Sequence, residues 1–193
     1  RTITRSRFRA LSRGFRQRWM RALYTHNLDV FYRALQYCAE HGISRYRVTS
    51  DLFPMSDYAL GQKLIAELAP AWLHWGRAQI EGVRVLIHPD QYVVISSLSD
   101  KVVANSIRIL EHHARVFDLL GLPRSPWAPI ILHGGKRGRH DALKRIIREL
   151  PEPVLARLVL ENDEHAYGAQ EVLDICRATG IPMVLDIHHH LVK

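Results

Sequence analysis

The sequence predicts an α/β fold, specifically a partial (β/α)8 (TIM) barrel in which about five of the eight strands are present. Two observations predict this fold. Short apolar stretches of strand length alternate with helical stretches along the chain, as they do in sheets whose strands run parallel. The strands are apolar throughout rather than at every second residue, which is typical of strands that helices cover on both faces.

The length of the chain narrows the choice of fold. With 193 residues, 47% of them hydrophobic, the chain has the size and composition of one globular domain. No Gly-x-Gly-x-x-Gly sequence follows any expected strand, so a dinucleotide-binding sheet has no positive support. A complete barrel needs eight strands and typically about 250 residues. We therefore expect an incomplete barrel.

The first half of the chain begins the alternation of helices and strands. One face of a helix is predicted by apolar residues spaced three and four apart: Leu28, Phe31, Leu35 and Cys38. Gly42 ends that helix. The elements expected next are a strand at 46–49, a helix at 58–75 and a strand at 83–87.

The second half repeats the pattern with clearer boundaries. Gly121 and Gly180 each follow a helical stretch, as glycines that end helices do. The expected elements are, in order, helix 100–120, strand 129–132, helix 141–150, strand 158–160, helix 169–179 and strand 183–185.

The positive charge of the chain is concentrated at one end. The net charge is +8, and residues 1–28 contain eight arginines and no lysine or acidic residue. We therefore distinguish an Arg-rich N-terminal segment, residues 1–27, from a partial-barrel catalytic domain, residues 28–193. Such a segment attracts polyanions, nucleic acid above all, or serves as a solubilising arm. No apolar run approaches the roughly 18 residues of a membrane-spanning helix, so no membrane partner is expected.

Four successive strands are followed by or end in residues that bind metals. His88, His133, Glu161 and Asp186 come at the strand ends, and His189 lies three residues after Asp186. In a barrel these ends meet at one rim, where active sites are built. Imidazole and carboxylate donors together suit Zn or Mn, with Mg also possible. We expect a divalent metal site, with Glu161 as the catalytic residue that bridges two ions.

Two loops beside these strand ends carry further candidate residues. Gln91 and Tyr92 lie three and four residues after His88, where an amide and an aromatic ring either contact a nucleobase or pack on their neighbours. Gly134 and Gly135 allow close approach of a ligand or form a plain turn. The cations after them are either a phosphate contact or a solvated loop: Lys136, Arg137 and Arg139.

The order of these motifs resembles the UV damage endonucleases, which share a barrel superfamily with endonuclease IV. The resemblance extends over nearly the whole chain from Asn27 and rests on these segments: 46–54 (Tyr-Arg-Val-Thr-Ser-Asp-Leu-Phe-Pro), 88–92 (His-Pro-Asp-Gln-Tyr), 133–135 (His-Gly-Gly), 160–163 (Leu-Glu-Asn-Asp) and 186–189 (Asp-Ile-His-His). It implies a (β/α)8 barrel with up to three divalent ions, usually manganese. It also implies incision of damaged double-stranded DNA 5′ to a UV photoproduct, leaving a 3′-hydroxyl and a 5′-phosphate.

The resemblance assigns roles to individual residues. It implies that the metal ligands are His88, His133, Glu161, Asp186 and His189, and that Gln91 and Tyr92 are inserted at the lesion. We further expect a monomeric protein of the cytoplasm, associated with the nucleoid if it is prokaryotic. The sequence departs from the family in lacking one strand before and two strands after those present. It also has Tyr58 where many relatives have a histidine.

Other functions remain open at this stage. Sugar isomerases and epimerases share the barrel and bind Mn or a similar ion with Glu, Asp and His. An AP endonuclease of the endonuclease IV type differs mainly in substrate. A non-catalytic DNA-binding remnant is the alternative outside the enzymes. The Arg-rich segment and the pair Gln91 and Tyr92 favour a DNA-acting enzyme over a sugar isomerase.

Overall fold

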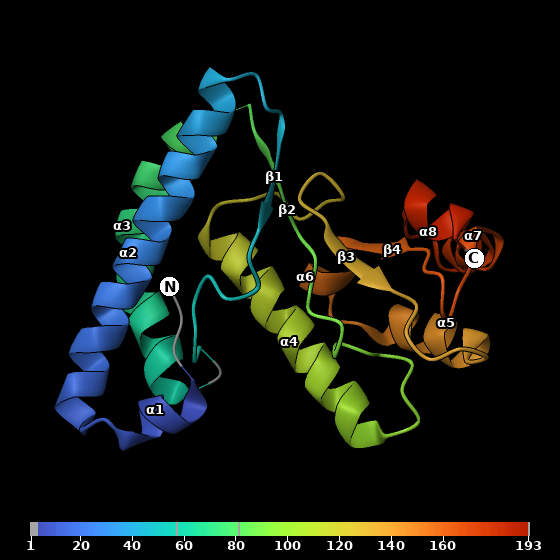
Figure 1. Ribbon diagram of the computed structural model, residues 1–193, viewed down its shortest axis with the longest axis horizontal. Coiled ribbons are helices and arrows are strands. Elements are labelled where there is room, and N and C mark those ends of the chain that lie inside the picture. The colour runs from blue at the N-terminus through green and yellow to red at the C-terminus, as the bar shows by residue number, and fades with distance from the viewer. Residues whose placement is uncertain (1–3, 57, 81, 193) are drawn as a thin grey trace. The chain divides into compact units, whose positions relative to one another are not determined.

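The computed structural model describes residues 4–56, 58–80 and 82–192. At least one helix lies between each pair of successive strands (Figure 1). The helices are α1 (Arg5–Ala10), α2 (Arg13–Glu40), α3 (Ala59–Ile80), α4 (Asp100–Leu119), α5 (His140–Glu149), α6 (Glu152–Leu155), α7 (Ala169–Thr179) and α8 (Ile187–Leu191). The strands are β1 (Arg45–Val48), β2 (Arg84–Ile87), β3 (Ile130–His133), β4 (Leu158–Glu161) and β5 (Met183–Val184).

The five strands form one sheet whose spatial order follows the chain, β1-β2-β3-β4-β5. β2 and β3, β3 and β4, and β4 and β5 are parallel pairs. A doubly wound sheet reverses its strand order at a switch point, whereas a barrel adds each strand beside the previous one. The strand order therefore confirms the α/β fold and its barrel-like progression.

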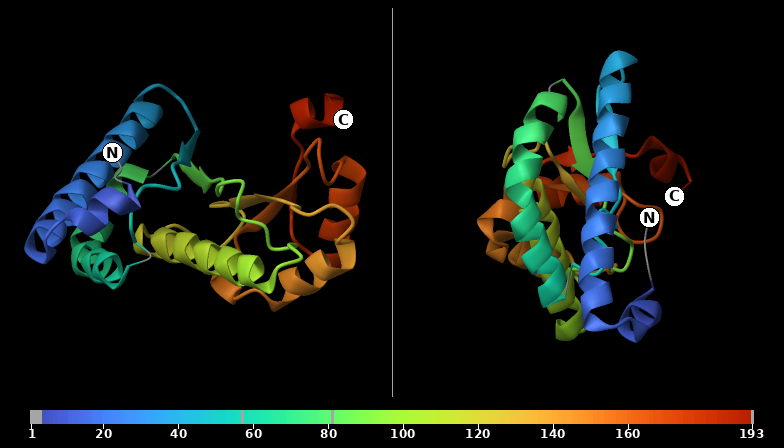
Figure 2. Two further views of the ribbon diagram at one scale, coloured as in Figure 1. Left: turned by 60° about the horizontal axis from the view of Figure 1, so that its bottom comes forward. Right: turned by 90° about the vertical axis from the view of Figure 1, so that its left-hand side faces the viewer.

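The chain divides into two compact units, and the division falls within β2. Unit 1 comprises Arg1–Val85 and Leu119–Gly121, and unit 2 comprises Leu86–Asp118 and Leu122–Lys193. In unit 1, α2 and α3 lie side by side (Figures 1 and 2). The helical face predicted from the sequence is buried there, as expected: Leu28, Phe31, Leu35 and Cys38.

The described part of the Arg-rich segment forms α1 and the first half of α2, which continues into that buried face. α2 begins at Arg13, so the helix runs without a break through residues 27 and 28. The difference in charge between 1–27 and 28–193 is thus not matched by a break in the chain's structure. Arg16 donates to the carbonyls of Arg9 (2.6 Å) and Leu11 (2.7 Å), which satisfies acceptors at the end of α1.

Tyr58 takes part in the packing of α1. Its ring lies 5.3 Å from that of Phe8, centroid to centroid, and its hydroxyl accepts a hydrogen bond from Nε of Arg9 at 3.4 Å. Phe8 is buried. Tyr58 therefore contacts the Arg-rich segment.

Unit 2 contains the strands that carry most of the candidate ligands. Every residue of β4 is buried, and α7 packs against β4, β5 and α5 (Figure 1). The guanidinium of Arg157 is completely buried, pairs with Asp118 at 2.8 Å and donates to the carbonyl of Leu122. A buried cation is stable only when its donors are satisfied in this way.

The end of the chain differs slightly from the expectation. The fifth strand is Met183–Val184 rather than 183–185, and α8 begins directly after Asp186. The Asp186 carboxylate accepts from the backbone N–H of His189 at 2.9 Å, which is the hydrogen bond of a helix N-cap. Both cysteines, Cys38 and Cys176, are free and buried.

Candidate metal centre

Three candidate ligands meet at one end of the sheet in unit 2. His133 and Glu161 are the last residues of β3 and β4 and pair in register across the two parallel strands. His88 directly follows β2, whose last residue Ile87 pairs with Ile130 at the start of β3. Apolar strands and their pairing thus bring together residues that lie up to 73 positions apart in sequence. We call His88, His133 and Glu161 the triad.

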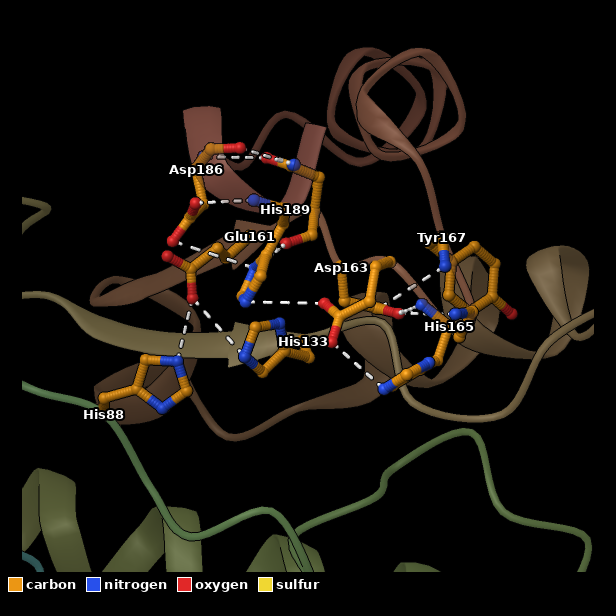
Figure 3. Close-up of polar contacts among 11 residues, drawn as sticks. His88, His133, Glu161, Asp163, His165, Tyr167, Asp186 and His189 are labelled. Atoms are coloured by element: carbon orange, nitrogen blue, oxygen red, sulfur yellow. Dashed lines mark hydrogen bonds and ion pairs between the residues drawn. The ribbon is translucent and has the colours of Figure 1, made fainter. Parts of the chain in front are cut away.

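The triad has the geometry of a metal site. Nε2 of His88 lies 2.8 Å and Nε2 of His133 lies 3.5 Å from Oε2 of Glu161. One ligand atom from each residue lies within 4.8 Å of the others. Figure 3 shows the two rings turned toward the carboxylate. Two imidazoles and a carboxylate around one point form a donor set that Zn and Mn accept.

The hydrogen bonds of the rings favour ligation through Nε2. Nδ1 of His88 lies 3.1 Å from the carbonyl of Pro89. Nδ1 of His189 lies 2.9 Å from the carbonyl of Asn162. A carbonyl only accepts, so Nδ1 donates in both rings, and Nε2 is the ring nitrogen left to bind a metal. This arrangement is the usual one for histidines that bind metals.

His133 is held in the form that binds metals. Burial lowers the pKa of His133. The negative charge of Glu161 raises it by less, so the pKa lies below 6.5. The positive charge of a protonated His88 would lower it further. His133 is therefore neutral near pH 7. Among the described residues its buried Nδ1 has no hydrogen-bond partner. Its Nε2 faces the Glu161 carboxylate and is therefore the atom that would bind a metal.

Asp186 and His189 lie beside the triad but are not members of the cluster of ligand atoms that lie within 4.8 Å of one another. The ring centroids of His189 and His133 are 5.4 Å apart. The hydrogen bond from the His189 backbone N–H lowers the pKa of Asp186, outweighing the effect of burial. Burial alone lowers the pKa of His189, but the Asn162 carbonyl and the carboxylates of Asp186, Glu164 and Glu161 together raise it above 6.5.

The structure adds Asn162, which sequence reasoning named only as part of a motif. Its side chain is completely buried. Its amide donates to the carbonyl of Asp186 at 2.9 Å and accepts from the N–H of Asp186 at 2.8 Å. Its own carbonyl orients His189. Asn162 therefore positions two of the expected ligands, and only its place directly after Glu161 could have signalled this.

Glu164 is a second residue that the sequence analysis did not single out. Its Oε2 lies 3.5 Å from Nε2 of His189, and its Oε1 lies 3.0 Å from Nε2 of His165. It adds a further carboxylate at the edge of the candidate site.

Comparison with known proteins decides the family. The sequence matches the family described as UV-endonuclease UvdE over residues 1–193. The chain belongs to the UvdE family. It is 46% identical over 194 residues to a UV DNA damage endonuclease of Nostoc sp. and 48% identical over 196 residues to one of Deinococcus radiodurans. These alignments cover 99% and 100% of this chain but 60% and 64% of the two relatives.

The fold agrees with that of a UvdE protein of known structure. The crystal structure of SacUVDE superposes with a TM-score of 0.87 at 27% sequence identity, covering 100% of this chain and 65% of that chain. The prediction of an α/β, partial TIM-barrel fold is therefore confirmed. The UvdE chain spans less than two thirds of its curated relatives.

The two expected lesion contacts lie on the loop that follows β2. Gln91 and Tyr92 are both exposed, and Tyr92 leaves 63% of its surface accessible. Neither is a member of the triad. Within the part of this UvdE chain that the structure describes, no helix has both the length and the hydropathy of a membrane span.

Proposed function

We propose that the chain is a metal-dependent DNA-repair endonuclease that incises the phosphodiester 5′ to UV photolesions in duplex DNA. The observation that carries this proposal is the triad of His88, His133 and Glu161 in a chain of the UvdE family. One ligand atom from each of the three residues lies within 4.8 Å of the others. Phosphodiester hydrolysis at a cluster of imidazole and carboxylate ligands is typical of two-metal enzymes.

The residues present fit a divalent ion, and manganese is our choice among Mn, Zn and Mg. His88, His133 and Glu161 would hold it, with Asp186 and His189 as further ligands. When bound, such ions neutralise the scissile phosphate, lower the pKa of a water molecule and stabilise the leaving 3′-oxygen.

The chain's own residues supply orientation and charge. Glu161 is buried between the two histidine rings, so its carboxylate is the candidate for the bridging position. Burial keeps His133 neutral, and the lowered pKa of Asp186 keeps its carboxylate ionised at neutral pH. Both are then in the protonation state of a ligand without an adjustment of pH.

Recognition of damage is assigned to the exposed loop after β2. Gln91 would hydrogen-bond and Tyr92 would stack at the lesion, because every base offers a face to an aromatic ring. A photolesion already weakens stacking, so opening the duplex there costs less than in intact DNA. An enzyme that selects damaged sites by how easily the duplex opens does not need to contact particular bases.

The Arg-rich segment, residues 1–27, is proposed to grip the DNA backbone, and residues 28–193 to form the catalytic domain. Arg7, Arg13 and Arg18 are exposed, and within the described ranges none makes an ion pair. We propose that the protein acts as a monomer in the cytoplasm, at the nucleoid in a prokaryote. Gel filtration at working concentration tests the oligomeric state.

Nicking of supercoiled plasmid with Mn²⁺ tests the proposal. Irradiated, abasic and undamaged plasmids are compared, using this chain and its full reading frame. Nicking of irradiated plasmid alone supports the UV endonuclease. Nicking of abasic plasmid alone indicates the endonuclease IV type. If the full reading frame binds metal but nicks neither damaged plasmid, the proposal fails and a sugar isomerase takes its place.

A further inference from the structure

The loops that follow the three triad residues are joined by two buried hydroxyl groups. Ser96, on the loop after His88, donates from Oγ to the carbonyl of Gly134 and accepts from the N–H of Lys136, both at 2.7 Å. Tyr167, on the loop after Glu161, donates to the carbonyl of Lys136 at 2.7 Å and accepts from the N–H of Arg139 at 3.0 Å. Residues 134–139, the loop after His133, are thus held from both sides.

The two glycines of this loop are required by the closeness of that packing. A Cβ on Gly134 would lie 2.3 Å from a ring carbon of Tyr167. Gly135 has a φ of +83°, and a Cβ there would lie 2.8 Å from Oγ of Ser96. The sequence left open whether these glycines make a plain turn. They let the backbone pass between two buried side chains, which a larger residue would prevent.

The same loop carries three cationic side chains, Lys136, Arg137 and Arg139. Lys136 and Arg137 are exposed and Arg139 is half-buried. None of the three side chains forms an ion pair or hydrogen bond among the described residues, and Nε of Arg139 is shielded from solvent with no acceptor. By contrast, the neighbouring cations Lys144 and Arg145 on α5 pair with acids on their own helix.

A fixed backbone gives these cations a defined position relative to the triad. Burial raises the pKa of Tyr167, so its hydroxyl keeps the proton that it donates to Lys136. Lys136 lies three residues after His133, and three residues span at most about 11 Å. The next phosphate along the same DNA strand lies within that reach.

We infer that the hydroxyl-fixed loop 134–139 is a DNA phosphate clamp, in which Lys136, Arg137 and Arg139 hold backbone phosphates beside the one at the triad. The inference rests on the proposed function, because it takes DNA as the substrate at the triad. Cations that serve only to solvate a loop can pair with nearby acidic side chains, as those on α5 do. These three have no such partner among the described residues. Because the backbone that carries them is already fixed, they can bind phosphates without the entropy cost of ordering the loop.

Binding of duplex DNA by the metal-free protein tests the clamp separately from catalysis. Fluorescence anisotropy with a labelled 30-base-pair duplex in EDTA gives the affinity over a series of salt concentrations. The test variant is Lys136→Gln with Arg137→Gln. The matched control is Lys101→Gln with Arg177→Gln, two exposed cations of the same unit that make no ion pair in the described ranges.

The clamp predicts a change in salt dependence. Each lost phosphate contact lowers the slope of log K against log salt by about 0.9, so the loop pair lowers it by about 2 and the control pair leaves it unchanged. Tyr167→Phe keeps the cations but frees the backbone, so it weakens binding about 2- to 10-fold with the slope retained.

Three outcomes overturn the clamp: an unchanged slope in the loop variant, an equal decrease in the control pair, or a parent chain that does not bind duplex DNA. Nicking by the same parent protein with Mn²⁺ is measured in parallel. If the loop variant shows the predicted slope change but neither this chain nor its full reading frame nicks irradiated plasmid, the clamp is supported and the endonuclease is overturned. If the parent nicks irradiated plasmid but the loop variant has the same salt slope as the parent, the clamp alone is overturned.

Discussion

The side-chain amide of Asn162 makes two hydrogen bonds to the backbone of Asp186, donating to its carbonyl at 2.9 Å and accepting from its N–H at 2.8 Å. Asn162→Ala leaves both groups of Asp186 without this partner and releases one of the strand ends at the site. We expect a loss of about 1–3 kcal/mol in unfolding free energy. We also expect Mn²⁺ affinity to fall about 10- to 100-fold, because residues that orient ligands have effects of that size.

A matched buried asparagine separates the two effects. Asn27 is also buried and donates to the carbonyl of Leu52 at 3.0 Å, in unit 1. Asn27→Ala should lower the unfolding free energy in urea while Mn²⁺ affinity, measured by calorimetry, stays unchanged. An equal loss of metal affinity in both variants would show that Asn162 acts only on stability.

Glu161→Gln tests the bridging carboxylate at constant shape. The amide loses the negative charge and one acceptor, so metal affinity and incision of irradiated plasmid should both fall to background. DNA affinity should stay within about twofold, because it comes from phosphate contacts elsewhere on the chain. Glu149→Gln, on an exposed ion pair with Arg145, is the control that should retain both activities. Normal turnover by Glu161→Gln contradicts the bridging role.

Tyr92→Ala tests recognition of the lesion. Stacking of one base on an aromatic ring is worth about 1–3 kcal/mol, and the preference for irradiated over intact duplex should fall by that amount. Binding of intact duplex should hardly change. Gln91→Ala should weaken the same preference through its lost hydrogen bond. Tyr37 is 56% exposed in unit 1, so Tyr37→Ala should leave the preference intact, and an unaltered preference in Tyr92→Ala excludes the role.

The stability of the chain should fall in mild acid because of His113. This side chain is 4% exposed, and burial, with a smaller effect of His112, lowers its pKa from 6.5 to about 3. Between pH 6.5 and 3 the unfolded chain binds a proton there and the folded chain does not. The stabilising effect is therefore complete above pH 6.5 and declines by about 1.4 kcal/mol per pH unit below it.

Urea unfolding of the parent and of His113→Leu between pH 7 and 4.5 measures this contribution. The unfolding free energy of the parent should fall more steeply with decreasing pH than that of the variant. Parallel curves would mean that His113 is protonated in the folded protein as readily as in the unfolded one.

Much of the fold could be predicted from local patterns. The buried face of α2 follows from the spacing of Leu28, Phe31 and Leu35, because one turn of helix repeats every 3.6 residues. The extension of α2 back to Arg13 was not predicted, since arginines at high density carry no apolar periodicity. β5 is two residues long, and the end of so short a strand depends on its neighbours rather than on its own sequence.

The sequence by itself determined that His88, His133 and Glu161 would share one edge of the sheet. Consecutive parallel strands end on the same side, so a residue at the end of each apolar run must come near the others. The ligand roles of Asp186 and His189 rest on the same reasoning, whereas the lesion roles of Gln91 and Tyr92 rest on the family resemblance. All four stay predictions. Which ring faces which carboxylate oxygen was beyond any pattern along the chain.

Only the tertiary structure decided how the site is held. The register of His133 against Glu161, the grip of Asn162 on Asp186 and the hydroxyl contacts of Ser96 with the next loop join residues that lie 24 to 40 positions apart. A hydrogen bond of this kind forms only when two backbones approach within about 3 Å in one orientation. Packing of the whole sheet and its helices sets that approach, and no local pattern encodes it.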